Sequence, residues 1–255
     1  MSLANLFRLQ FLALLLLTPG LRAAGVPDDC TQLLVAVEPD WNAKEGELRL
    51  YERPRGGKWT QEGDMIPVLF GKNGLAWGSG IAGQGESGLR KKERDGRAPA
   101  GVFRLGKIYT YDAQLPGGSS FPFRQVTTAD AWIDDPTHPE YNRFVTIPDP
   151  KNPPAWFEKQ KMRHNDFAYR WLVEIRHNSD PPAAGDGSAI FFHIRRGVTR
   201  PTAGCTTMAE EELARVISWL KSAGRPCYAL LPAAEYGKKW KTWNLPAPTA
   251  PRAKE

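Results

Sequence analysis

Residues 188–220 read SAIFFHIRRGVTRPTAGCTTMAEEELARVISWL, and three patterns meet in this segment. Residues 188–194 form a short apolar run rich in β-branched and aromatic side chains, which predicts a buried strand. Residues 207–210 match the capping box, in which a threonine and a glutamate satisfy free backbone donors, so a helix should begin at about Met208. The apolar residues that follow recur with helical spacing on one face, and they are Leu213, Val216, Ile217 and Leu220.

Two residues of this segment have side chains suited to nucleophilic catalysis. His193 falls near the end of the predicted strand, and Cys205 lies two residues before the predicted helix cap. Free N–H groups and the helix dipole favour an anion there, so the reactive thiolate should be stabilised. Gly204 allows a substrate carbonyl to come close, which makes the N–H groups of Gly204 and Cys205 candidate oxyanion donors. His193 is then the candidate general base.

A purely structural interpretation of the same pair stays open. A lone cysteine most often behaves as a small buried apolar residue, and a lone histidine is most often held by structural hydrogen bonds. The glycine, the predicted cap and the predicted strand together favour catalysis over this alternative.

The motifs around the pair resemble a known family. His193 followed by the run Thr202, Ala203, Gly204, Cys205, Thr206, Thr207 is similar to the signature of the L,D-transpeptidases of the YkuD type. Residues 97–103, RAPAGVF, are similar to the proline, glycine and phenylalanine motif of that family. The resemblance covers residues 30 to about 232. It implies a mainly β catalytic fold, a β-sandwich or barrel, with one main α-helix after the cysteine, and cross-linking of peptidoglycan stem peptides through a Cys205 thioester.

The sequence departs from the family pattern at two positions. Many members have histidine before the glycine and arginine or asparagine two residues after the cysteine, whereas this chain has Ala203 and Thr207. The missing cation changes how an anionic acyl donor would be held. We therefore expect a donor other than the diamino acid at stem position 3, namely the L-alanine at position 1, which would give links of the 1,3 type.

Several polar residues near the pair are candidate substrate contacts. Thr202 is a candidate positioning residue. Arg195, Arg196 and Arg200 lie between base and nucleophile, and their guanidinium groups match substrate carboxylates. Asn178 follows the predicted strand 169–176 and either orients a substrate or loop or caps a turn. For the arginines the alternative is charge that is solvated on a loop.

Composition and charge set the broad class. The chain has 255 residues, 41% of them hydrophobic, and a formal net charge of +6, which indicates a basic globular protein. Residues 1–24 resemble a secretory signal peptide, with retention as a membrane anchor as the alternative, so we expect a 25–245 catalytic domain and a disordered tail at 246–255. Removing Arg8 and Arg22 lowers the charge to +4. We expect export to the periplasm or cell envelope, no membrane span after cleavage, a monomer, and no nucleic-acid partner.

Export favours paired cysteines, and three are present. If Cys205 stays free, a disulfide between Cys30 and Cys227 would tie the domain ends together; the alternative is two buried thiols. His138 and His164 lack the spacing of a metal site, so we expect neither metal nor cofactor.

The remaining segments predict about eight short strands and few helices. Expected strands outside 188–194 are 31–37, 47–53, 65–70, 99–105, 169–176 and 228–231. Residues 71–88 predict a loop around Trp77, either a substrate-facing flap or a connector. Lys91, Lys92 and Arg94 should be solvated, and Trp240 and Trp243 should pack back on the domain.

Three functions are compatible with these patterns. The first is the L,D-transpeptidase. The second is a hydrolase of murein peptides, an L,D-carboxypeptidase, which results if water reaches the thioester before an amine. The third is an inactive wall-binding module, motivated by the missing arginine and the basic, tryptophan-rich surface.

Overall fold

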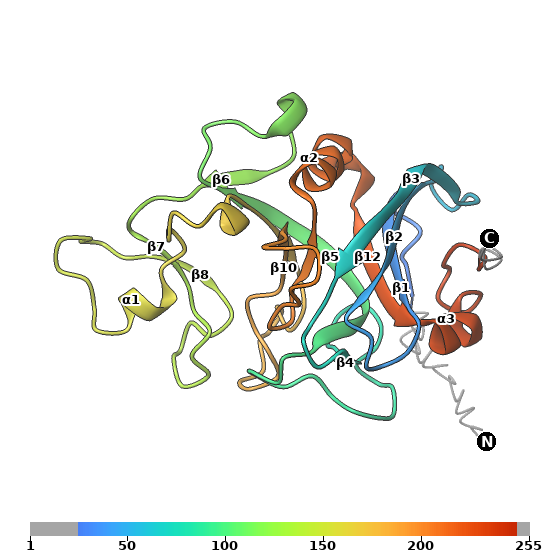
Figure 1. Ribbon diagram of the computed structural model, residues 1–255, viewed down its shortest axis with the longest axis horizontal. Coiled ribbons are helices and arrows are strands. Elements are labelled where there is room, and N and C mark those ends of the chain that lie inside the picture. Colours follow the sequence, from blue (N-terminus) through green and yellow to red (C-terminus); the bar gives the residue numbers. More distant parts are fainter. Residues whose placement is uncertain (1–24, 249–255) are drawn as a thin grey trace, which may run out of the picture.

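The computed structural model describes residues 25–248 of the protein, shown in Figure 1. The expected signal peptide and residues 249–255 of the expected tail lie outside this part of the chain. The described strands are β1 (Gln32–Glu38), β2 (Glu45–Glu52), β3 (Thr60–Leu69), β4 (Leu75–Trp77), β5 (Ala98–Thr110), β6 (Phe123–Gln125), β7 (Asp130–Trp132), β8 (Phe144–Thr146), β9 (Trp171–Ile175), β10 (Phe191–Ile194), β11 (Thr206–Met208) and β12 (Cys227–Pro232). The α-helices are α1 (Phe157–Gln160), α2 (Glu210–Trp219) and α3 (Ala233–Lys239).

Eight of the strands close into a barrel. They follow the order β12-β1-β2-β3-β11-β10-β9-β5, and pairing of β5 with β12 closes the ring. Strands β4 and β6 also pair with β5. Closure removes the open strand edges that a sheet would expose, and the predicted mainly β fold is confirmed.

The barrel interior holds the main hydrophobic core, and helix α2 adds its apolar face to it. Leu213, Val216 and Ile217 are fully buried, as their helical spacing predicts. Along β10 the burial alternates by face: Phe192 and Ile194 belong to the interior core, whereas Phe191 belongs to a second cluster outside it. Because side chains alternate along a strand, His193 lies on the outer face with Phe191.

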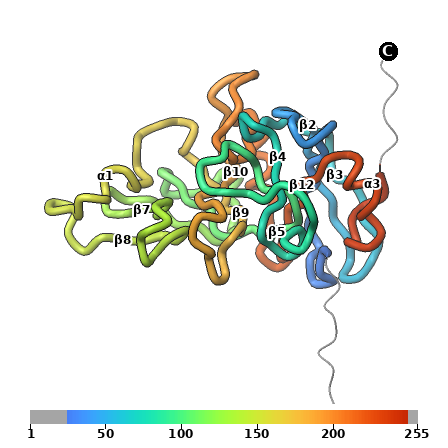
Figure 2. The backbone as a smooth tube through the Cα atoms, turned by 90° about the horizontal axis from the view of Figure 1, so that it is seen from below, coloured from blue at the N-terminus to red at the C-terminus, as the bar shows by residue number. Residues whose placement is uncertain are grey.

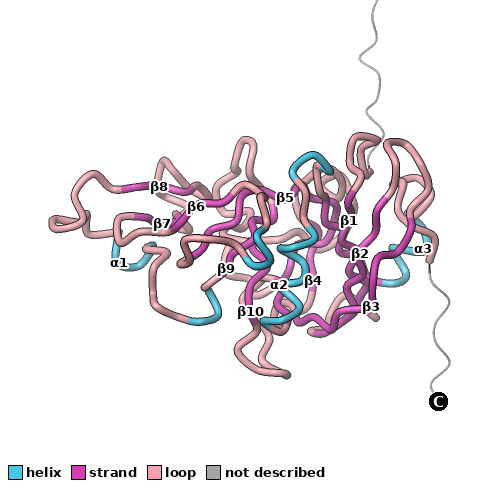
Figure 3. Tube along the Cα trace, turned by 90° about the horizontal axis from the view of Figure 1, so that it is seen from above, coloured by secondary structure: helices cyan, strands magenta, loops and turns pink. Residues whose placement is uncertain are grey.

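An extension of the chain packs on this outer face. It runs from β7 through β8 and α1, and Figures 1, 2 and 3 all show it projecting from the barrel on the side away from α3. Its Trp132 and Phe144 pack against Tyr109 of β5 and Phe191 of β10 in edge-to-face and stacked contacts. Cys205 lies at the margin of the same cluster. The extension therefore forms one wall beside the candidate nucleophile.

The C-terminal segment packs back on the barrel, as predicted. Trp243 is buried and meets Trp77 at 6.2 Å between ring centroids, and the half-buried Trp240 packs against the core. Pro246 accepts a hydrogen bond from the hydroxyl of Tyr236 at 2.8 Å. This contact holds the first residue of the expected tail on the domain.

The expected disulfide is absent from the structure. Cys30 and Cys227 are buried free thiols, which was the alternative pattern. They are neighbours because β1 and β12 run side by side, with Leu33 opposite Cys227. The two thiols hydrogen-bond to each other, and each also lies near a backbone carbonyl, Cys30 at 3.1 Å from Gln32 O and Cys227 at 3.8 Å from Arg225 O.

The segment before β5 differs from the sequence prediction in two ways. Strand β4 interrupts the predicted loop 71–88 and buries Trp77, so this loop is anchored as a connector would be. Lys91, expected to be solvated, is only 4% exposed. Its ammonium group donates to Asp95 Oδ1 at 2.6 Å and to the Lys92 carbonyl, which compensates for the burial of the charge.

Candidate functional site

Strand pairing brings the histidine and the cysteine to one face of the barrel. β10 and β11 are parallel, with Phe192 opposite Thr206 and His193 opposite Thr207. Cys205, one residue before Thr206, therefore shares the outer face with Phe191 and His193. The two candidate catalytic residues, twelve positions apart in sequence, are brought together by this register.

A threonine side chain fixes the turn that carries the cysteine. Thr202 Oγ1 donates to the Cys205 carbonyl at 2.6 Å and accepts the Gly204 N–H at 3.0 Å. Gly204 has φ +150°, and a Cβ at that position would come within 2.8 Å of the Arg97 carbonyl. A side chain is therefore excluded here for two reasons. The Gly204 N–H, predicted as an oxyanion donor, is already bonded to Thr202, which leaves the Cys205 N–H as the candidate donor.

His193 is buried and held in one orientation. Its Nδ1 lies 2.9 Å from the Ile194 carbonyl. A carbonyl only accepts, so Nδ1 carries the proton and Nε2 keeps a free lone pair. The Tyr169 ring packs edge-on at 5.2 Å, and the Arg196 guanidinium lies 4.6 Å from the centre of that ring while pairing with Asp166.

Burial keeps both candidate catalytic groups uncharged. It lowers the pKa of His193 to about 4, so the imidazole is a neutral base at physiological pH. It raises the pKa of Cys205 to about 11. The Cys205 thiol donates to the Ala189 carbonyl at 3.5 Å. The site thus has a protonated thiol and a neutral histidine on one face of the barrel, so a thiolate must form by proton transfer during the reaction.

Residues 43–229 match the model of the L,D-transpeptidase catalytic domain, named YkuD. The chain belongs to this L,D-transpeptidase family. The match covers well over half of the chain and includes both motifs on which the resemblance was based. A comparison with curated proteins found no match.

Cys205 is not at a helix start, contrary to the sequence prediction. Thr206–Met208 is strand β11, and α2 begins only at Glu210 with Ala209 as a cap that has no side-chain bond. Thr207 Oγ1 lies 3.5 Å from the Leu69 carbonyl of β3, so it does not cap the helix. Residues 206–208 pair instead with β10 and, at Thr207, with Leu69 of β3. The helix dipole therefore does not lower the thiol pKa.

The predicted substrate contacts of this L,D-transpeptidase domain are in different environments. Arg196 stands beside the Tyr169–His193 pair, Arg195 is half-buried, and Arg200 is exposed on the loop between base and nucleophile. Asn178 is 4% exposed, and its side chain bonds Ala183 and Gly187 within its own loop. It orders the loop and has no surface to offer a substrate.

One residue that the sequence analysis passed over joins the extension to the site. The amide of Asn142 donates to the carbonyls of His177 and Asn178 at 3.0 and 2.7 Å. Its oxygen accepts the N–H of Ala189 at 3.0 Å and the indole N–H of Trp132 at 3.1 Å. The Ala189 carbonyl accepts the hydrogen bond of the Cys205 thiol, so Asn142 positions the residue to which the candidate nucleophile is bonded. No sequence pattern signals this role. The one unusual local feature of Asn142 is its φ of +55°, which asparagine tolerates and which the sequence does not reveal.

Replacing Asn142 with aspartate should weaken both stability and function. The variant keeps the shape but removes both donors, and each buried carbonyl left unpaired costs about 1–3 kcal/mol. We expect a lower midpoint of denaturant unfolding and slower acylation of Cys205. Gln114→Glu, at an exposed position, is the control and should change neither. Lost stability with an unchanged acylation rate would exclude a positioning role for Asn142.

The raised thiol pKa predicts slow alkylation of Cys205 in the free protein. With the pKa at about 11, the iodoacetamide rate should rise about tenfold per pH unit from pH 7 to about 10 without levelling off. The Cys205→Ala variant gives the background from Cys30 and Cys227. A plateau below pH 8 would show instead that the free enzyme already holds a thiolate.

Among residues 25–248, no cluster of three or more His, Cys, Asp or Glu side chains is close enough to hold a metal ion. Within the same range, no helix has the length and hydropathy needed to cross a membrane.

Proposed function

We propose that this protein is a peptidoglycan L,D-transpeptidase that uses Cys205 as nucleophile and His193 as base. The observation that carries the proposal is the shared outer face of β10 and β11, on which a neutral imidazole and a thiol lie within an L,D-transpeptidase domain. Export to the cell envelope is part of the proposal, because the substrate is there.

In the first half-reaction His193 Nε2 takes the proton of the Cys205 thiol, and the thiolate attacks the carbonyl of an L-configured stem residue. The Cys205 N–H stabilises the developing oxyanion. The C–N bond to the next residue then breaks, and the leaving amine takes the proton from the imidazolium. A thioester and a neutral histidine remain.

In the second half-reaction an amine of another stem peptide attacks the thioester and gives a proton to His193. The new amide forms as the C–S bond breaks, and the sulfur recovers the proton from the imidazolium. The products are a cross-linked dimer and the free enzyme. Water in place of the amine would give a trimmed monomer, which is the carboxypeptidase outcome.

We further propose that the donor is the L-alanine at stem position 1. Thr207 is 1% exposed, uncharged and engaged with Leu69, so it brings no cation to the donor. Arg196 lies over the Tyr169 ring that packs on His193, and it would supply the charge. Dimers joined only through the position-3 carbonyl would contradict this choice and leave the transpeptidase itself intact.

Purified muropeptides give the direct test. Wild-type protein should produce new dimers, Cys205→Ala none, and tandem mass spectrometry of the dimers should locate the linked carbonyl. Trimmed monomers without dimers would select the hydrolase. Incubation with a carbapenem, followed by intact mass, should add one acyl group at Cys205. Absence of both dimers and adduct would favour the inactive wall-binding module.

A further inference from the structure

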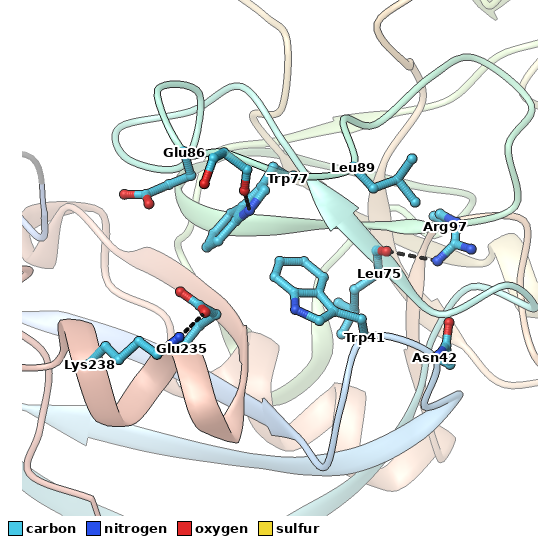
Figure 4. Close-up of a pocket in the computed structure, with 11 residues that line it drawn as sticks. Trp41, Asn42, Leu75, Trp77, Glu86, Leu89, Arg97, Glu235 and Lys238 are labelled. Carbon is cyan, nitrogen blue, oxygen red and sulfur yellow. Dashed lines mark hydrogen bonds and ion pairs between the residues drawn. The ribbon is translucent and has the colours of Figure 1, made fainter.

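A cavity lined by neither candidate catalytic residue lies between the β1–β2 connection, strand β4 and helix α3. Its volume is about 400 Å³, within the range of small-ligand sites. Figure 4 shows the indoles of Trp41 and Trp77 in its middle. They meet edge to face, with ring centroids 4.9 Å apart. Trp41 is half-buried, and Leu89 in the wall is 56% exposed, so apolar surface is available to a ligand.

The polar groups of this tryptophan cavity surround the indoles and balance in charge. Glu86, Glu235 and Lys238 stand on one side in Figure 4, and Arg97 and Asn42 on the other. Two carboxylates and two cations give a lining with no formal net charge. Lys238 pairs with Glu235 at 2.8 Å and Lys239 with Glu86, so a cationic ligand gains no free carboxylate there, whereas Arg97 donates to the Leu75 carbonyl.

A half-buried lysine holds the wall of the cavity in place. Lys239 donates to Glu86 at 2.6 Å and lies 5.5 Å from the Trp77 ring and 5.1 Å from the Trp243 ring. The Trp77 indole N–H also donates to the Ser87 carbonyl at 2.8 Å. Trp77, itself buried, is therefore fixed and supports the half-buried Trp41 ring, which presents the aromatic surface to a ligand. A surface fixed before binding lowers the entropy cost of binding.

The cavity also adjoins the turn of the nucleophile. The Arg97 side chain lines it and donates to the Leu75 carbonyl at 3.0 Å, while the Arg97 carbonyl packs against Gly204. Arg97 therefore connects the wall of the cavity with the turn that carries Cys205.

We propose that the tryptophan cavity binds a saccharide. A sugar ring offers an apolar C–H face for an indole and hydroxyl groups for carboxylate, amide and guanidinium partners, and it needs no net charge in its site. A purely apolar ligand would remove water from the polar rim without offering hydrogen bonds in its place. That the saccharide is the glycan strand of peptidoglycan rests on the proposed function; the binding of a sugar does not.

The test is titration of the full chain with a soluble tetramer of β-1,4-linked N-acetylglucosamine. We expect the indole N–H signals of Trp41 and Trp77 to shift in NMR spectra, and Trp41→Ala to weaken binding at least about tenfold. Leu89→Asp, at an exposed position that should not affect folding, should do the same. Trp240→Ala is the matched control outside the cavity and should bind as wild type.

No shift of either indole at about 10 mM sugar, or equal affinity in the Trp41 and Leu89 variants, would overturn the proposal. Carbapenem acylation of Cys205 is measured in the same samples. Loss of acylation with intact sugar binding would count against the proposed function alone, and normal acylation without sugar binding would count against the saccharide site alone.

Discussion

His193→Gln should slow acylation of Cys205 by about 10²–10⁴-fold at neutral pH, the usual contribution of a general base. Glutamine fills a similar volume but cannot accept the thiol proton. The cost should be large because burial raises the thiol pKa to about 11, so unassisted ionisation of Cys205 is rare at pH 7. The measurement is the rate of carbapenem adduct formation followed by intact mass.

The pKa of His193 determines how the acylation rate of the wild type depends on pH. Burial lowers the pKa of His193 to about 4, so the base form persists as pH falls and is lost only as the pH approaches 4. A fall in rate centred near pH 6.5 would contradict this environment. His138→Gln, outside the pair, is the control and should leave the rate unchanged. A rate within threefold of wild type for His193→Gln would assign the base to another group.

The barrel could be predicted in part from the sequence, because its strands carry their own signals. The run at 188–194 has apolar residues on both faces, and β10 is indeed covered by the interior core on one side and by the extension on the other. The helical spacing after Glu212 likewise predicted the buried face of α2, since that face depends on the 3.6-residue period alone.

The start of α2 could not be predicted, because it depends on partners distant in sequence. Residues 206–208 satisfy a capping pattern locally, yet they pair with β10 and with Leu69 of β3. The burial of Lys91 could not be predicted either, because it depends on the ion pair with Asp95 and on the conformation of the loop. The proline-rich extension gave no periodic signal, so its Asn142 contact with Ala189 was also missed.

A buried carboxyl group in the barrel is the strongest departure from sequence expectation outside the site. Glu38, the last residue of β1, is fully buried, and neither of its side-chain oxygens has a partner among the described residues. Gly46 leaves room for it, since a Cβ there would come within 2.7 Å of Glu38 Oε1. Burial, with the nearby Asp40 and Glu45 carboxylates, raises the pKa of Glu38 to about 9. Glu38 is therefore protonated at pH 7.

Replacing Glu38 with glutamine should remove a pH dependence of stability that the wild type carries. With its folded pKa near 9 and an unfolded pKa near 4.5, the wild type gains full stability from this proton below pH 4.5 and loses it as pH rises to 9. The slope is about 1.4 kcal/mol per pH unit, so the loss between pH 4.5 and pH 7 is roughly 3 kcal/mol. Denaturant unfolding of both proteins across this range gives the difference. As pH rises, the free energy of unfolding of Glu38→Gln should increase steadily relative to that of wild type. The free energy of unfolding of Glu62→Gln, at an exposed position of β3, should change with pH in parallel with wild type. Parallel curves for Glu38→Gln as well would mean that water or a rearranged partner solvates this carboxylate in the folded state.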